Sequence, residues 1–262
     1  MKLVIIGLGS IGKKHKQNLE LLGHEIVPSF ENVDGALVCN PTALHLETAL
    51  KFTNLKMPVF IEKPLSHNLN GLDQLKGNIL VGYCLRFNES LRKFKNNIPQ
   101  KGIKSVKIVC QSWLPDWHPQ TDYRQSYSAK KELGGGVLLD LSHEIDYSLW
   151  FFGPVKKVSA RLQMSPELEI ETEAIADLEL EFISGIKADI HLSYASHQPA
   201  RFCEIKTNNK TLLWNFKSNN KMYLEEMKHF IKVIQGKEKP LVTVTDGINV
   251  LKVIETAKIN QL

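Results

Sequence analysis

A glycine-rich loop directly after a short apolar run is the feature of this sequence that most constrains its fold. Residues 2–6 read KLVII, and residues 7–12 read GLGSIG. In a strand–loop–helix unit, Gly7 permits a tight turn, Gly9 lets a pyrophosphate approach the backbone, and Gly12 lets the helix pack closely on the strand. N–H groups at the start of the helix would then face the phosphates. The loop predicts a dinucleotide site, with a methyltransferase-like adenosine site and a vestigial loop as the alternatives.

The segment after the second expected strand decides which dinucleotide fits. An acidic residue there would hydrogen-bond the adenosine ribose and favour NAD. Pro28 and Ser29 stand in that place, and Glu31 comes slightly later, where a solvated loop charge is an equally good interpretation. The sequence therefore leaves NAD and NADP open. The stretch 28–34 is also too short for the usual helix and strand, so we expect a shortened nucleotide domain.

The hydrophobic pattern changes near residue 97. Before it, apolar runs that suit a parallel sheet buried on both faces alternate with helical spacing; the expected strands are 2–7, 24–28, 35–40, 58–63 and 79–84, and the expected helices are 11–22, 42–52 and 69–76. After it, apolar and polar residues alternate with a period of two, which is typical of half-buried antiparallel strands. Helical spacing returns over Val137–Phe152 and from Lys221 to the end. We predict an α/β fold: a Rossmann-type parallel-sheet domain over 1–97, and an α+β domain with a large, mainly antiparallel sheet over 98–262.

Composition argues against several classes of protein. The formal net charge is only +5 and no dense Lys/Arg stripe occurs, so nucleic-acid binding is not expected. No apolar run reaches about 18 residues, and no cleavage site follows the first strand, so we expect neither a membrane span nor a signal peptide. The four cysteines lack a CxxC pair and indicate buried thiols in a reducing compartment. We therefore predict a cytoplasmic protein. Because no His/Cys cluster has metal-ligand spacing, we also predict that it has no metal site.

Two motifs follow expected strands at the edge where open parallel sheets bind ligands. The first, CNPTALH (39–45), supplies Asn40 and Thr42, which could contact a cofactor or cap the next helix. The second, IEKP (61–64), places Lys63 in the same crevice. The cofactor-binding residues expected in this domain are Gly7, Gly9, Ser10, Ile11, Gly12, Asn40, Pro41, Thr42, His45, Glu62, Lys63 and Arg86.

Taken in order, these motifs resemble the Gfo/Idh/MocA family of NAD(P)-dependent oxidoreductases. The matching stretches are GLGSIGKKH, CNPTALHLETAL, FIEKPL, VGYCLRF, GGGVLLDLSHEIDYSLWFFG and DGINVLKVIE, and they span nearly the whole chain. In that family the lysine of the Glu-Lys-Pro motif lies beside the nicotinamide and the substrate hydroxyl, which implies this role for Lys63. The family's glycine-rich stretch leads into a helix whose Asp and His face the substrate, which implies Asp140 and His143. These two residues are three positions apart, whereas many members separate them by four.

The resemblance implies a mechanism with three catalytic residues. His143 would accept the hydroxyl proton as general base, Lys63 would hydrogen-bond the same oxygen, and Asp140 would orient the imidazole or bind a neighbouring hydroxyl. Either Lys63 or His143 could be the proton carrier, and Asp140 and His143 could instead be ordinary helix residues. The neighbouring Glu144 and Asp146 are expected to be structural or surface groups.

An aromatic stretch, WLPDWHPQTDYRQSYS (113–128), is a candidate lid. Tyr123 could stack on a sugar face, and Arg124 could bind a carboxylate or phosphate. The alternative is an ordered loop anchored by its tryptophans. The expected substrate-binding residues are Lys63, Tyr123, Arg124, Asp140 and His143.

The sequence thus predicts hydride transfer between NAD or NADP and a carbinol carbon of a sugar-type small molecule. The family resemblance points toward surface-polysaccharide precursors. A non-catalytic dinucleotide-responsive regulator and an NAD-assisted glycosidase, both also known in the family, are the alternatives. A large sheet with helices on one side leaves a face to cover, so a homo-oligomer, a dimer or a tetramer, is expected.

Overall fold

The computed structural model describes residues 1–261, and the chain divides into two compact units. Unit 1 comprises Met1–Asn88 and Asn219–Leu251, whereas unit 2 comprises Glu89–Ser218 and the segment from Lys252 onward. The units divide first at residues 88 and 89, whereas the expected boundary lay at residues 97 and 98. The chain returns to unit 1 late in the sequence because the apolar face of a C-terminal helix packs there; the ring centroids of Phe60 and Phe230, for example, are 5.8 Å apart.

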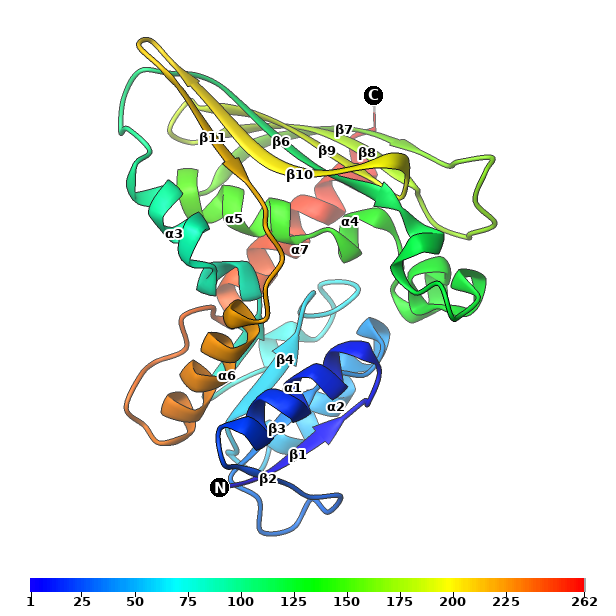
Figure 1. Ribbon diagram of the computed structural model, residues 1–262, viewed down its shortest axis with the longest axis vertical. Helices are drawn as coiled ribbons and strands as arrows, with labels where there is room; N and C mark the ends of the chain where they lie inside the picture. Colours follow the sequence, from blue (N-terminus) through cyan, green and yellow to red (C-terminus); the bar gives the residue numbers. More distant parts are fainter. Residues whose placement is uncertain (262) are drawn as a thin grey trace. The chain divides into compact units, whose positions relative to one another are not determined.

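Unit 1 contains the predicted parallel sheet, in the order β2-β1-β3-β4-β5. Its strands are β1 (Lys2–Ile6), β2 (Glu25–Ile26), β3 (Gly35–Val38), β4 (Val59–Glu62) and β5 (Ile79–Gly82). Residues of β3, β4 and β5 are buried throughout, which explains their continuous apolar character. The sheet is accompanied by helices α1 (Ser10–Leu21), α2 (His45–Thr53) and α6 (Lys221–Ile234) (Figure 1).

The nucleotide domain is shortened where the sequence indicated. Strand β2 has two residues, and residues 27–34, which join it to β3, hold neither a helix nor a strand. The expected helix over 69–76 is reduced to one 3-10 turn, η2 (Leu72–Gln74), which follows Gly71 in a left-handed conformation. A single connected sheet nevertheless survives both losses.

Unit 2 contains a mixed six-stranded sheet in the order β11-β10-β6-β9-β8-β7. Every pairing is antiparallel except β6 with β9. Its strands are β6 (Ile103–Trp113), β7 (Val155–Gln163), β8 (Ile175–Phe182), β9 (Lys187–Ser193), β10 (Ala195–Thr207) and β11 (Thr211–Asn215). In β8, buried and less buried residues alternate, as the period of two predicted. Helices α3 (Glu89–Asn96), α4 (Val137–Asp140) and α5 (His143–Phe152) lie along one side of this sheet (Figure 1).

Two expected helices are interrupted. The helix expected over Val137–Phe152 divides into α4 and α5. The backbone leaves helical geometry at Leu141 (φ −95°, ψ 25°), and the Ser142 N–H donates a hydrogen bond to the Leu139 carbonyl. The C-terminal helix divides into α6 and α7 (Val244–Ile259). Gly236 adopts a left-handed φ of 68° just after α6, which stops that helix.

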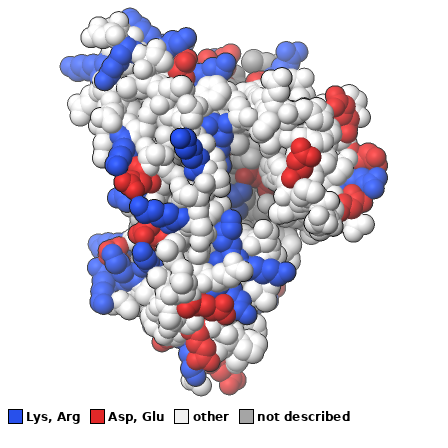
Figure 2. Space-filling model, in the orientation of Figure 1, with Lys and Arg blue, Asp and Glu red and all other residues white. Residues whose placement is uncertain are grey.

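Cysteine burial, the charges of one face and helix hydropathy describe the exterior and interior of the chain. All four cysteines are buried as thiols. Acidic and basic side chains are mixed over the face that Figure 2 shows. Within residues 1–261 there is no helix both long and apolar enough to span a bilayer.

A buried ion pair ties α5 to the sheet of unit 2. The Arg201 guanidinium donates from Nε to Glu144 Oε1 at 2.7 Å and from Nη2 to Oε2 at 3.0 Å. The Glu144 side chain is 0% exposed, and that of Arg201 is 21% exposed. This forked pairing accounts for one acid of the motif helix, and it satisfies both carboxylate oxygens.

Replacing Glu144 by Gln should lower the free energy of unfolding by about 3–5 kcal/mol, because it leaves a largely buried guanidinium without its counter-charge. Urea unfolding measures the loss. Glu167→Gln is the control, since that carboxylate is 65% exposed opposite His197 and should contribute less than about 1 kcal/mol. Equal losses in the two variants would contradict a structural role for the buried pair.

Candidate functional site

The glycine-rich loop has the geometry that its sequence predicted. It connects β1 to α1 with Gly7 at a φ of 97°. A Cβ on Gly12 would lie 1.9 Å from the Gly7 carbonyl oxygen, so only glycine permits this approach of helix to loop. A Cβ on Gly9 would meet no atom of the described chain within 4 Å. Gly9 therefore faces open space at the N-terminus of α1, where Ser10 and Ile11 begin the helix, and this cradle fits the pyrophosphate of a dinucleotide.

The residues after β3 are held by hydrogen bonds within unit 1. Asn40 Nδ2 donates to Thr48 Oγ1 at 2.9 Å, and Thr42, after Pro41, begins a 3-10 turn. The His45 ring places Nε2 2.8 Å from the Asn40 carbonyl and Nδ1 2.8 Å from the Pro64 carbonyl. Burial lowers the pKa of His45, whereas the two carbonyls that face its ring nitrogens act in the opposite direction. His45 thus joins the ends of β3 and β4, and its two nitrogens face protein carbonyls.

Glu62 and Lys63 occupy the end of β4. Glu62 is buried, and its Oε2 accepts a hydrogen bond from the Lys63 backbone N–H at 3.0 Å. Its Oε1 lies 2.6 Å from Nε2 of His15, a residue of α1. The Lys63–Pro64 peptide bond is cis. Glu62 therefore connects the helix that follows the glycine-rich loop with the lysine of the Glu-Lys-Pro motif.

Arg86 lies in the 3-10 helix η3 (Cys84–Phe87) and is buried. Its Nη2 lies 3.5 Å from Oδ1 of Asp246, whose other oxygen accepts hydrogen bonds from the backbone and hydroxyl of Thr243. Arg86 therefore anchors the start of α7.

In unit 2, Asp140 and His143 lie on either side of the break in the motif helix. Asp140 ends α4, and its Oδ2 accepts a hydrogen bond of 2.6 Å from the buried Tyr194 hydroxyl. Burial, followed by the Asp140 charge, raises the pKa of Tyr194 well above its ordinary value, so the phenol stays protonated. His143 begins α5 and is 8% exposed. The sequence carried no signal for Tyr194, which is 54 positions from its partner.

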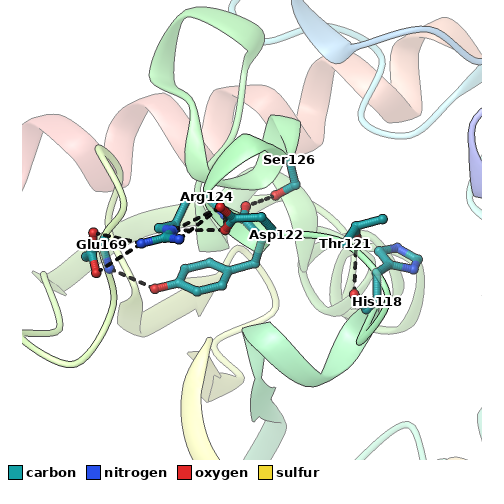
Figure 3. A network of polar contacts seen from close by, with 7 residues as sticks. His118, Thr121, Asp122, Arg124, Ser126 and Glu169 are labelled. Carbon is teal, nitrogen blue, oxygen red and sulfur yellow. Dashed lines mark hydrogen bonds and ion pairs between the residues drawn. The ribbon is translucent and has the colours of Figure 1, made fainter.

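The aromatic stretch folds as successive 3-10 turns. Figure 3 shows Arg124 between two acids: its Nε is 2.9 Å from Asp122 Oδ1, and its Nη1 is 3.4 Å from Glu169 Oε2. The Tyr123 hydroxyl accepts a hydrogen bond from the Glu169 backbone N–H at 3.1 Å. Its hydrogen bonds with Asp122 raise the pKa of Arg124 above its ordinary value. Arg124 thus has two acidic partners within the chain, and an anionic substrate would compete with them.

Two glycine variants separate dinucleotide binding from folding. Gly9→Ala should fold like the wild type but bind a dinucleotide roughly tenfold or more weakly, a loss of about 1.4 kcal/mol, because its Cβ would occupy the place of the pyrophosphate. Gly12→Ala should lower the unfolding temperature even without ligand, because its Cβ meets the Gly7 carbonyl. Thermal unfolding with and without NAD+ distinguishes the two effects. Unchanged NAD+ binding by Gly9→Ala would contradict the assigned phosphate cradle.

Comparison with known proteins places both units in one family. The model of an oxidoreductase family with an NAD-binding Rossmann fold matches residues 22–78, and the model of the Gfo/Idh/MocA C-terminal domain matches residues 102–212. Together they cover nearly two thirds of the chain.

One curated relative is similar over almost the full length. The myo-inositol 2-dehydrogenase of Thermotoga maritima is 25% identical, and the match covers 94% of this chain and 92% of that protein. That alignment extends over 315 positions, so the relative carries segments that this chain lacks.

Two solved structures share the fold over nearly their whole length. The WlbA dehydrogenase of Bordetella pertussis, in complex with NADH and UDP-GlcNAcA, has a TM-score of 0.83 at 18% identity, covering 99% of this chain and 95% of that one. The scyllo-inositol dehydrogenase of Lactobacillus casei, with bound NAD(H) and scyllo-inositol, has a TM-score of 0.80 at 18% identity, covering 100% and 96%. These structures show the shared fold, and the two family models establish that the chain belongs to the Gfo/Idh/MocA family of oxidoreductases with an NAD-binding Rossmann fold.

Proposed function

We propose that this protein oxidises a ring hydroxyl of a cyclitol or sugar, including sugars carried on a nucleotide, with NAD+ as hydride acceptor. The observation that carries the proposal is the intact phosphate cradle at Gly9, with Glu62 fixing the Lys63 peptide at the end of β4. A relative named for myo-inositol and solved structures that hold scyllo-inositol or UDP-GlcNAcA support the substrate class. A role in surface-polysaccharide precursor synthesis remains part of the proposal.

The bound nicotinamide would supply the hydride acceptor. Side chains of this protein would transfer the proton. His143 would accept it from the substrate hydroxyl, and Lys63 would donate a hydrogen bond to the same oxygen. Asp140, oriented by the Tyr194 hydroxyl at 2.6 Å, would orient the imidazole or bind a neighbouring hydroxyl. In the reverse direction, His143 would return the proton to the ketone oxygen. The products of oxidation are a ketone, NADH and one proton.

The segment after β2 favours NAD over NADP. Residues 27–34 contain the acids Glu31 and Asp34 and no Lys or Arg, whereas a 2′-phosphate is ordinarily held by a cation at this position. Both acids are exposed, and Asp34 Oδ2 accepts a hydrogen bond from the Lys2 backbone at 2.8 Å.

NAD+ or NADH at about 100 times its dissociation constant should stabilise the fold by roughly 2.7 kcal/mol, and the NADP pair at equal concentration should stabilise it less. Thermal unfolding with the four dinucleotides in parallel measures the difference. A larger shift with the NADP pair would refute the cofactor assignment.

Lys63→Met and His143→Asn should each lower kcat for NADH formation by about 10²–10⁴-fold, the usual contribution of acid–base catalysis, with a retained NAD+-induced shift in unfolding temperature. The assay follows NADH with inositols, hexoses and UDP-linked sugar acids. Lys51→Met is the matched control, because that lysine is 66% exposed and pairs with Glu47 on α2. Dinucleotide binding without turnover of any substrate would favour a regulator, and sugar release without net NADH would favour an NAD-assisted glycosidase.

A further inference from the structure

Three titratable side chains from distant parts of the sequence meet in the interior of unit 1. His15 comes from α1, Glu62 from the end of β4, and Glu226 from α6. His15 and Glu226 are 0% exposed, and Glu62 is 7% exposed. One nitrogen or oxygen of each lies within 4.8 Å of the others. His15 and Glu62 are joined by their 2.6 Å contact, whereas Glu226 is joined to neither.

Glu226 is the unusual member of this cluster. Within residues 1–261, neither of its carboxylate oxygens has a hydrogen-bond partner. A buried ionised carboxylate without a partner is very costly, and a second negative charge on Glu62 nearby adds repulsion. We propose that Glu226 is a neutral carboxylic acid that stores a proton beside the His15–Glu62 pair, and that it thereby positions Glu62 and the Lys63 peptide.

The surroundings of Glu226 agree with a neutral group. Burial, and then the Glu62 charge, raise the pKa of Glu226 well above its ordinary value. Just after β3, burial raises the pKa of the Cys39 thiol, and the charges of Glu62 and Glu226 act in the same direction. Tyr223 lies one turn before Glu226 on α6, and its pKa is raised by the adjacent Cys84 of η3 and by burial.

Neither of the nearby basic side chains, Lys14 and His15, is placed to neutralise an ionised Glu226. Lys14 Nζ lies 4.3 Å from the centroid of the Tyr223 ring, over the ring face. His15 is the other group that could carry positive charge. A proton on its buried Nδ1, which has no partner within residues 1–261, would leave both an unpaired N–H and a bare Glu226 carboxylate. Placing the proton on Glu226 leaves one unpaired O–H but no unpaired buried charge, which is the smaller cost.

A metal ion is the competing occupant, because one imidazole and two carboxylates can bind a divalent cation. Ligand atoms about 2.0–2.2 Å from one tetrahedral metal lie roughly 3.3 Å apart. His15 Nε2 and Glu62 Oε1 are 2.6 Å apart, which is the distance of a hydrogen bond with a charged partner. The geometry of the cluster therefore fits a proton shared in a hydrogen bond better than a metal ion bound by both atoms.

Glu62 transmits the state of Glu226 to the dinucleotide site. Its two oxygens bond His15 on α1 and the Lys63 backbone N–H. If Glu226 ionised, repulsion would push Glu62 away from these two partners. Glu226 is thus a positioning residue for Lys63. This last step rests on the proposed function, whereas the stored proton does not.

The test compares wild-type protein with Glu226→Gln by infrared difference spectroscopy and by urea unfolding from pH 5 to 9. The wild type should show the carbonyl stretch of one protonated carboxylic acid at pH 7 that the variant lacks. The folded state holds this proton above the ordinary Glu pKa of about 4.3, at which the unfolded chain releases it. The wild-type unfolding constant should therefore rise by up to about tenfold per pH unit relative to the variant, until Glu226 itself ionises.

Two further variants sharpen the comparison. Glu225→Gln, on the adjacent side chain that is 41% exposed and pairs with Lys228, should keep both the band and the wild-type pH dependence. Glu226→Met removes the same acid without adding an amide, and it serves where Glu226→Gln does not fold.

A missing band, a stability difference that does not change with pH, or one equivalent of divalent metal in elemental analysis of purified protein would each overturn the stored proton. NAD+ affinity over the same pH range tests the positioning step: it should fall with rising pH in the wild type more than in Glu226→Gln, and equal falls would overturn that step. If no dinucleotide binds at all, the proposed function fails, while the band and the pH dependence still decide the protonation of Glu226.

Discussion

The approach of the Gly7 carbonyl to Gly12, where a Cβ would lie 1.9 Å away, is the contact on which the rest of unit 1 depends. It fixes where α1 starts relative to β1 and β3, because the loop also packs against Cys39 after β3. The direction of α1 then brings His15 onto Glu62 at 2.6 Å. Through Glu62, a steric requirement at two glycines after β1 reaches the Lys63 peptide at the end of β4, two strands away in the sheet.

Local and periodic features could be predicted from the sequence. The strand–GLGSIG–helix unit, the parallel sheet, the short link after β2 and the alternating strands of unit 2 each follow from neighbouring residues. The interruption between α4 and α5 could not be predicted, because Leu141 and Ser142 include neither glycine nor proline. The return of α6 to unit 1 likewise depends on packing such as Phe60 on Phe230, across 170 positions of sequence.

The candidate site divides in the same way. Glycines and strand-end residues could be located by position, but their partners could not. Glu144 in the motif helix meets Arg201, and Asp140 meets Tyr194, each more than 50 positions away. Arg124, a candidate for substrate contact, lies between Asp122 and Glu169. Residue type and spacing indicate where a charge can act, and only the fold determines what already neutralises it.

Two buried glutamates show how the two units meet one physical requirement differently. A carboxylate removed from water needs a counter-charge, hydrogen-bond donors or a proton. Glu144 receives a guanidinium that satisfies both its oxygens, and it therefore ties α5 to β10 as an ion pair. Glu226 receives no donor within residues 1–261 and lies beside a second carboxylate, so the proton is the remaining solution. An ion pair is insensitive to pH over the neutral range, whereas a buried neutral acid can lose its proton as the pH rises. Of the two glutamates, Glu226, linked through Glu62 to the Lys63 peptide, is therefore the one that can respond to pH.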